Sequence, residues 1–128
     1  MDITQNNKKD IRDFLHYIAS CGCSTARQAK YIYPLEKIAR WLGKDFIEAK
    51  KEDLQVLVEY IDIAKKDDDE PNGIKEVKSY IVKNKGNNRP TKYSSWTKMD
   101  YKITIKKFWK WLHNKHIEDE DEWETPTS

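Results

Sequence analysis

The chain has 128 residues, of which 36% are charged, 38% are hydrophobic and 12% are aromatic. No segment approaches the run of ~20 apolar residues that a membrane-spanning helix needs, and the aromatic content is too high for an intrinsically disordered protein. Four Gly and four Pro are too few for an all-β protein with many tight turns. We therefore predict one all-α domain with a highly charged surface.

The spacing of apolar residues predicts two helices in the first third of the chain. The first covers residues 8–20, and Asn7 is a suitable N-cap. The second covers residues 24–42 and ends at Gly43, because glycine is the residue type most common just after a helix. Pro34 removes a backbone donor and crowds the preceding turn. We therefore expect a kink at this proline, or two short helices that meet there.

The rest of the chain predicts two further helices and one ambiguous segment. The third helix begins near Lys51 with two acids in its first turn, where the helix dipole favours them. Residues 74–81 have the spacing of a short amphipathic helix, and residues 83–92 have the composition of a loop. The last helix covers residues 95–114 and has the clearest apolar pattern of all.

The second and last helices share a template at an offset of 70 residues. Ser24, Tyr31, Leu35, Ile38, Trp41 and Leu42 correspond to Ser94, Tyr101, Ile105, Phe108, Trp111 and Leu112. Their spacing places the apolar members along one stripe of each helix. We predict that the two helices present similar faces to a shared core.

The formal net charge is +2, but its distribution is uneven. Residues 72–117 contain twelve Lys and Arg and only two acids, whereas residues 118–128 contain six acids and no base. Segregation of this kind is typical of a polyanion-binding surface followed by an acidic tail. The alternative is a solvated lysine-rich face without a partner.

The last helix carries a lysine ridge opposite its inward stripe. The expected inward residues are Tyr101, Ile105, Phe108 and Leu112. The ridge consists of Lys102, Lys106 and Lys110, with Lys107 alongside. No acid is near enough in sequence to pair with these lysines, so bound phosphates would relieve their mutual repulsion. A second apolar stripe, formed by Trp96, Met99 and Ile103, is predicted to be additional core.

Hydroxyl, amide and cationic side chains gather at the starts of the second and last helices. These clusters are Ser24, Thr25, Arg27 and Gln28 in the second helix, and Tyr93, Ser94, Ser95, Thr97 and Lys98 in the last. Free backbone N–H groups and the dipole favour an anion at a helix N-terminus, and these side-chain types bind phosphates and base edges. The alternative is that at least one Ser in each cluster is an ordinary N-cap.

Three motifs make the sequence recognisable. They are Tyr-x3-Leu-x2-Ile-x2-Trp-Leu in residues 31–42, Glu-Asp-Leu at 52–54, and Ser-x-Trp-Thr-Lys-x-x-Tyr-Lys at 94–102, followed by Phe-x-x-Trp-Leu at 108–112. Together they resemble the N-terminal core-binding (SAM-like) domain of tyrosine recombinases, in particular the archaeal phage-integrase branch. The resemblance covers about residues 7–117, apart from an insertion-like segment at 66–90. It implies a four-to-five-helix bundle of two crossed helical hairpins.

The resemblance also implies a function and a set of contact residues. Such a domain forms half of a clamp around double-stranded DNA, with its second and fourth helices directed at the major groove and the flanking backbone. The matching positions here are Thr25, Arg27, Gln28, Lys30, Ser94, Ser95, Thr97, Lys98, Lys102 and Lys106. The family's catalytic residues belong to a C-terminal domain, so we expect this chain to bind DNA without cleaving it and without a cofactor. Residues 118–128 are then expected to begin an interdomain linker.

The same resemblance sets expectations for partners and location. Besides DNA, the expected partners are other recombinase protomers in a DNA-bound assembly, with the isolated chain monomeric and no membrane association. Cys21 and Cys23 are too close in sequence for an unstrained disulfide, which favours a reducing, cytoplasmic setting. The DNA binding that the resemblance implies would make the protein nucleoid-associated.

Two other interpretations stay open at this point. His113 and His116, with Cys21 or Cys23, are possible zinc ligands, but a convincing set of four at regular spacing is missing. The more serious alternative is a helical protein–protein interaction module that does not bind DNA.

Overall fold

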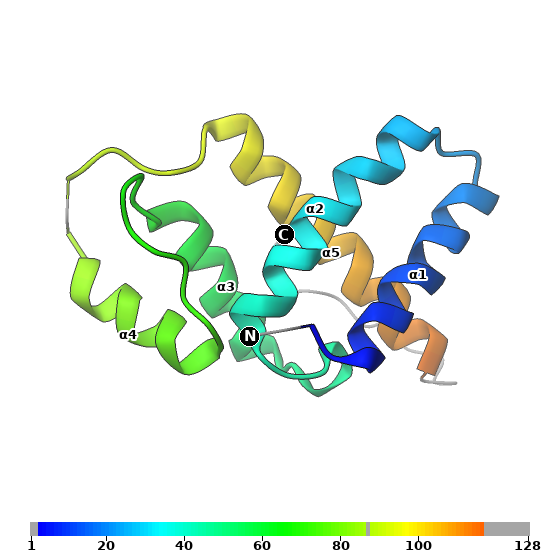
Figure 1. The fold of residues 1–128 in the computed structure, drawn as a ribbon, viewed down its shortest axis with the longest axis horizontal. Helices are drawn as coiled ribbons and strands as arrows, with labels where there is room; N and C mark the ends of the chain where they lie inside the picture. The colour runs from blue at the N-terminus through cyan, green and yellow to red at the C-terminus, as the bar shows by residue number, and fades with distance from the viewer. Residues whose placement is uncertain (1–2, 87, 117–128) are drawn as a thin grey trace.

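Residues 3–86 and 88–116 are described by the computed structural model, and they form five α-helices and one short 3-10 helix (Figure 1). In chain order these are α1 (Gln5–Ser20), α2 (Thr25–Leu42), η1 (Phe46–Glu48), α3 (Lys51–Ile63), α4 (Ile74–Asn84) and α5 (Ser95–His116). Across these residues the only strand-like pairing is an isolated bridge between Lys65 and Thr91. The all-α prediction is confirmed, whereas the two crossed hairpins of a SAM-like domain stay a prediction.

Local sequence signals correctly identify both ends of α2. The hydroxyl of Ser24 accepts a hydrogen bond from the backbone N–H of Arg27 at 3.3 Å, as an N-cap does. At the other end, Gly43 has a left-handed φ of 69°, a conformation that costs glycine little. The helix therefore begins and ends at residues whose own chemistry favours a terminus.

The start of α1 differs from the prediction, because Asn7 is not its N-cap. The helix begins at Gln5, and the Thr4 hydroxyl accepts from the N–H of Asn7 at 3.2 Å. The buried Asn7 side chain instead donates to the carbonyl of Lys44 at 2.9 Å and accepts from the N–H of Phe46 at 2.8 Å. These bonds join α1 to the segment after α2, a contact over 39 residues that no local capping pattern encodes.

Helix α2 continues through Pro34, so the expectation of two short helices is wrong. The missing N–H leaves one helical hydrogen bond unmade, at a cost of ~3 kcal/mol or more in a helix interior. Leu35 and Ile38 follow directly and are completely buried. Burial of each such side chain contributes ~1.5–3 kcal/mol. Together the two contributions offset the cost of Pro34 when α2 packs as one continuous helix.

The core is rich in aromatic residues and joins α1, α2, η1, α3 and α5. Its largest fully buried side chains are those of Trp41, Trp109, Tyr60, Phe14, Phe46 and Phe108. The ring centroid of Phe108 lies 5.2 Å from that of Phe14 and 4.7 Å from that of Phe46, at the separations favoured by edge-to-face pairs. The indole N–H of Trp109 donates to the carbonyl of Phe46 at 3.0 Å. The α5 stripe predicted to face inward is confirmed, since Tyr101, Ile105, Phe108 and Leu112 are all buried.

The insertion-like segment at 66–90 contains α4 and packs against α3. The rings of Tyr60 and Tyr80 meet edge to face with centroids 5.3 Å apart. The Tyr80 hydroxyl donates to the Asp68 carboxylate at 2.6 Å and accepts from the N–H of Lys65 at 2.9 Å. Arg89 donates to both oxygens of the same carboxylate, at 3.2 and 2.9 Å. The expected short amphipathic helix is therefore present, and Tyr80 connects it to α3 and to the segment that precedes it.

A second carboxylate attaches this segment to the rest of the bundle. Glu70 accepts from the ammonium of Lys37 on α2 at 3.0 Å and from that of Lys92 at 3.4 Å. We refer to Asp68, Glu70 and their partners Lys37, Tyr80, Arg89 and Lys92 as the carboxylate network. It joins α2, α4 and the chain that enters α5.

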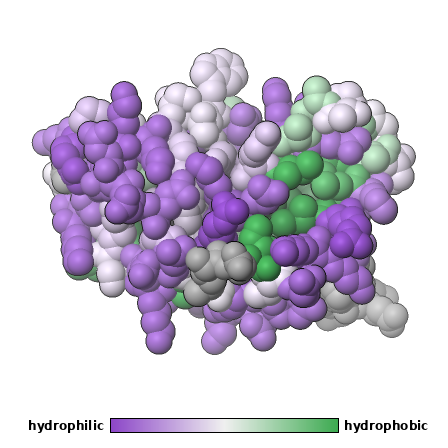
Figure 2. Space-filling view, viewed as in Figure 1, coloured by the Kyte–Doolittle hydropathy of each residue, from purple (hydrophilic) through white to green (hydrophobic). Residues whose placement is uncertain are grey.

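Hydrophilic residues cover most of the face drawn in Figure 2, with a hydrophobic area where α1 and α2 face each other. None of the helices formed by residues 3–86 and 88–116 is long and apolar enough to cross a membrane.

Candidate nucleic-acid interface

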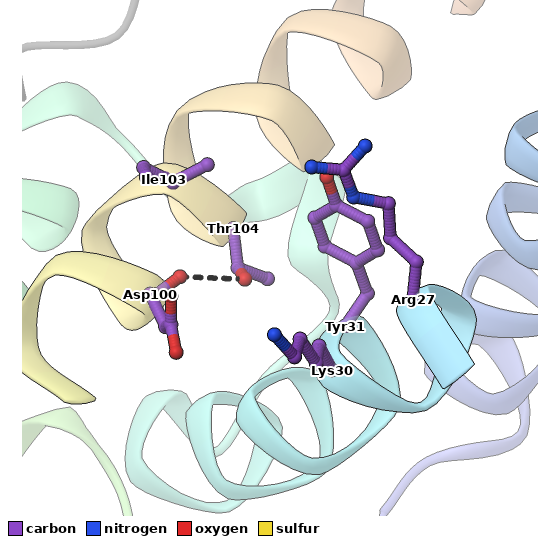
Figure 3. A pocket seen from close by; sticks show the side chains of 6 residues that line it. All are labelled: Arg27, Lys30, Tyr31, Asp100, Ile103 and Thr104. Atoms are coloured by element: carbon purple, nitrogen blue, oxygen red, sulfur yellow. Dashed lines mark hydrogen bonds between the residues drawn. The ribbon is translucent and has the colours of Figure 1, made fainter. Parts of the chain in front are cut away.

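A hollow of about 130 Å³ opens between the first half of α2 and the middle of α5 (Figure 3). It is lined by Arg27, Lys30, Tyr31, Asp100, Ile103 and Thr104. Figure 3 shows the Lys30 side chain reaching from α2 toward Asp100, while the Arg27 guanidinium lies beside the Tyr31 hydroxyl. Two helices far apart in the sequence thus place cationic, aromatic and apolar groups around one depression.

The floor of this hollow is ordered by contacts within and between the helices. The Thr104 side chain is buried, and its hydroxyl donates to the carbonyl of Asp100 at 2.8 Å, one turn earlier in α5. The ammonium of Lys107 lies 5.5 Å from the centroid of the Tyr31 ring, within the range of a cation–π interaction. Lys107 therefore belongs to the same surface as the α2 cations, although the sequence placed it only beside the ridge.

A second hollow, of about 480 Å³, adjoins the first at the start of α2. Its lining consists of Cys21, Gly22, Cys23, Ser24, Ala26, Arg27 and Lys30. The two hollows share Arg27 and Lys30, so these cations stand on the wall between them. A ligand that tracks from one hollow to the other passes both.

The four residues nominated on α2 lie together at its start. Thr25, Arg27 and Lys30 are exposed, whereas Gln28 is half-buried. The amide of Gln28 donates to the carbonyl of Cys23 at 3.2 Å and so helps to hold the loop before the helix. Reading a base edge with the same amide group would require that hydrogen bond to break.

The hydroxyls at the start of α5 are used for capping, as the alternative interpretation proposed. The Ser94 hydroxyl accepts from the N–H of Thr97 at 3.3 Å and lies 3.1 Å from the Thr97 hydroxyl. Ser95 is exposed and Lys98 is half-buried. The structure thus gives Ser94 and Thr97 a local role, while Ser95 and Lys98 keep their side chains at the surface.

Lys102 departs from the prediction that the lysine ridge has no acidic partner. Its ammonium forms an ion pair with the Asp62 carboxylate at 2.8 Å. Asp62 lies on α3, 40 positions away in the sequence, so only the tertiary fold brings the two together. Lys102 consequently faces α3, whereas the exposed Lys106 lies one turn further along.

The second apolar stripe of α5 is not additional core, so this prediction is wrong. Trp96, Met99 and Ile103 are 78%, 54% and 49% exposed. The helix packs through its other stripe and through the buried Trp109, whose indole N–H donates to the carbonyl of Phe46 in η1. An apolar surface is therefore left facing outward on the helix with the most lysines.

The exposed apolar and basic residues of α5 share one face. At 100° per residue they lie within about 100° of the helix circumference, over an axial length of about 21 Å. We call this set the α5 outer face: Trp96, Met99, Ile103, Lys106, Lys107 and Lys110. This face could have been found from the sequence, because its residues fall within one sector of a helical wheel.

Two carboxylates with shifted pKa values, Asp68 and Glu70, lie in the carboxylate network, away from this surface. Hydrogen bonds from Tyr80 and Arg89 lower the pKa of Asp68. Burial raises the pKa of Glu70, but the ammonium groups of Lys37 and Lys92 together lower it below its usual value. These shifts mark groups that stabilise the fold.

Two further groups of titratable residues also have structural roles. Burial raises the pKa of Asp53 on α3, but hydrogen bonds from Lys44 and from the N–H of Lys50 lower it by more. Burial raises the pKa values of Tyr60, Tyr93 and Tyr101, which is the opposite of the shift that activates a tyrosine as a nucleophile.

The zinc alternative gains no geometric support in the part of the chain that the structure describes. That part contains no group of three or more His, Cys, Asp or Glu side chains that could hold a metal ion. Cys21 and Cys23 carry free thiols. The side chain of His116 and the acidic tail at 118–128 lie outside the described residues.

We compared the chain with known protein families, curated proteins and solved structures. No family model, curated protein or solved structure matches the chain. The resemblance to recombinase core-binding domains therefore stays a prediction from the sequence motifs.

Proposed function

We propose that the chain is a double-stranded-DNA-binding domain of the core-binding type, which holds one side of a duplex for a separate recombinase catalytic domain. One observation carries the proposal: Arg27 and Lys30 of α2 line the hollow between α2 and α5, and Lys107 of α5 lies over the ring of Tyr31, which lines the same hollow. Lys106 extends this basic surface along α5. The sequence motifs support it, because they resemble a family that uses its second and fourth helices in this way.

Duplex DNA suits this surface on charge and on size. DNA presents closely spaced phosphates, and each cation that contacts one releases condensed counterions. A single helix fits the major groove, which is ~12 Å wide, while a second helix can reach the flanking backbone. Helix α5 supplies an exposed face for the groove, and the start of α2 supplies cations beside it.

The test is duplex binding measured by fluorescence anisotropy over a range of salt concentrations. We expect binding to weaken steeply with salt, with a log–log slope near −0.9 for each phosphate contacted. Lys106→Gln and Lys107→Gln should weaken binding to all duplexes alike, each with a salt slope shallower by about 1. A change at Arg27 should alter sequence preference instead.

Two controls of equal charge separate this surface from lysine content in general. Lys75→Gln and Lys83→Gln each remove one exposed lysine from α4, outside the α2–α5 surface, and should leave affinity unchanged. Lys102→Gln, on α5 itself, should have a smaller effect than Lys106→Gln because Asp62 already pairs with Lys102. Equal losses from α4 and α5 variants would contradict the assigned surface.

The second candidate is a protein–protein interaction module, favoured by the exposed Trp96, Met99 and Ile103. It predicts association that does not depend on salt and no affinity for duplex DNA. Failure to bind any duplex at low salt would therefore overturn the DNA-binding proposal in its favour.

A further inference from the structure

The α5 outer face is apolar in its first half and basic in its second. Trp96, Met99 and Ile103 lie at its N-terminal end, and three exposed lysines follow over the next two turns. Ile103 is also part of the hollow that contains Arg27 and Lys30. The apolar side chains are thus bordered by the lysines of α5 on one side and by Arg27 and Lys30 of α2 on the other.

This combination narrows the chemistry of a partner. The cations of the α5 outer face favour a polyanion as the partner. The apolar stripe of the same face would be buried well only if that polyanion also presents apolar groups. In duplex DNA the thymine C5-methyl group meets that need, since it projects into the major groove between the acceptors and donors of the base edges. A helix in the groove points its central face at base edges and its flanks at phosphates.

Asp100 is the acidic member of the hollow and fits the same arrangement. It lies at the border of the α5 outer face, and the Lys30 side chain extends toward it in Figure 3. The neighbouring ammonium reduces the repulsion between this carboxylate and a phosphate. Met99 and Ile103 are four residues apart, about 6 Å along the helix axis, which is close to the ~6.8 Å rise of two base-pair steps.

We propose that Ile103 and Met99 read thymine methyl groups in the major groove, with Trp96 continuing the apolar contact at the start of α5. This inference rests on the proposed DNA-binding function and adds a specificity to it. It assigns the phosphate contacts to Lys106 and Lys107. The domain is expected to prefer sites with two thymines two base pairs apart over sites that lack them.

The experiment begins by selecting bound duplexes from a randomised library with the full chain. Each thymine of the selected site is then replaced singly by deoxyuridine, which removes only the C5-methyl group and keeps base pairing. Affinity is measured by fluorescence anisotropy at one fixed salt concentration. At each contacted thymine we expect a loss of about fourfold, the factor for one methyl group removed from an apolar contact.

Variants then connect the effect to the stripe. Ile103→Ala and Met99→Ala should each abolish the difference between thymine and deoxyuridine at one position, and should keep the salt dependence of binding. Both side chains are half exposed, so folding is checked by thermal melting and is expected to be unchanged. The matched control is Val82→Ala on α4, an apolar residue that is 77% exposed and should keep the full difference.

The possible failures are distinguishable. Absence of any salt-dependent duplex binding overturns the DNA-binding function itself. Salt-dependent binding with no enriched sequence, or with equal affinity for thymine and deoxyuridine duplexes, keeps that function and overturns the thymine contact. If Ile103→Ala abolishes self-association in sedimentation and leaves the thymine effect intact, the stripe is a protein contact and the inference is also overturned.

Discussion

The two sides of the bundle are built differently. On the α3–α4 side, carboxylates are held by cations and hydroxyls: Asp68 by Tyr80 and Arg89, and Glu70 by Lys37. On the α2–α5 side, Arg27 and Lys106 reach the surface and an apolar stripe faces outward. The first side uses its charges in intramolecular contacts that stabilise the fold, and the second keeps them available for a partner. Substitutions should therefore affect stability on one side and binding on the other.

The largest expected effect comes from the core that both sides share. Phe108→Ala removes a fully buried ring that contacts Phe14 and Phe46, and should lower the free energy of unfolding by ~3–5 kcal/mol. The exposed Lys106 provides the comparison, since Lys106→Ala should change the free energy of unfolding by less than ~0.5 kcal/mol. Urea denaturation followed by circular dichroism measures both values, and similar losses would refute the assigned orientation of α5.

Low pH should destabilise the protein through the carboxylates of the α3–α4 side. The pKa values of Asp53, Asp68 and Glu70 are lowered by folding, so each group contributes stability above its unfolded pKa, near 4, and loses it as the pH falls through the folded pKa. We expect the melting temperature to decrease between pH 5 and pH 2. Glu70→Gln should decrease less over that range than the unaltered protein, because one of the three groups no longer titrates. An identical pH profile would show that Glu70 is not held as described.

A smaller loss is expected from Asp53, where α3 begins. Its carboxylate accepts from the N–H of Lys50 at 3.0 Å and pairs with Lys44 at 2.8 Å, so Asp53→Ala should cost ~1–2 kcal/mol of stability. The adjacent Glu52 is exposed, and Glu52→Ala should cost less than ~0.5 kcal/mol. Thermal and urea denaturation of the pair separates a cap from a general effect of acidic residues in the first turn.

The smallest expected effect concerns Lys102, which lies where the two sides meet. Its ion pair with Asp62 is partly exposed, so Lys102→Ala should change the free energy of unfolding by no more than ~0.5 kcal/mol. A double-mutant cycle with Asp62→Ala measures the coupling. A coupling above ~1 kcal/mol would show that Lys102 stabilises the fold, as the charged residues of the α3–α4 side do.

Much of the candidate site could be predicted because it consists of local patterns. Arg27 and Lys30 were nominated at the start of α2, and the structure places both at the surface beside α5. Ser94 was nominated for DNA but caps α5, since a hydroxyl before a helix can satisfy a nearby backbone N–H. Lys107 was missing from the nominated set because its position over Tyr31 depends on how α2 and α5 pack.

The sequence by itself determined the helical class, the approximate positions of the helices and both ends of α2, because these follow from periodicity and from the chemistry of Ser24 and Gly43. The tertiary structure alone decided that the second apolar stripe of α5, formed by Trp96, Met99 and Ile103, is exposed, because periodicity shows that a stripe is apolar but not whether another element covers it. It also decided that Asn7 joins α1 to Phe46 and that Lys102 meets Asp62. Each of those contacts joins segments about 40 residues apart, and only the packing of the whole chain brings such segments within bonding distance.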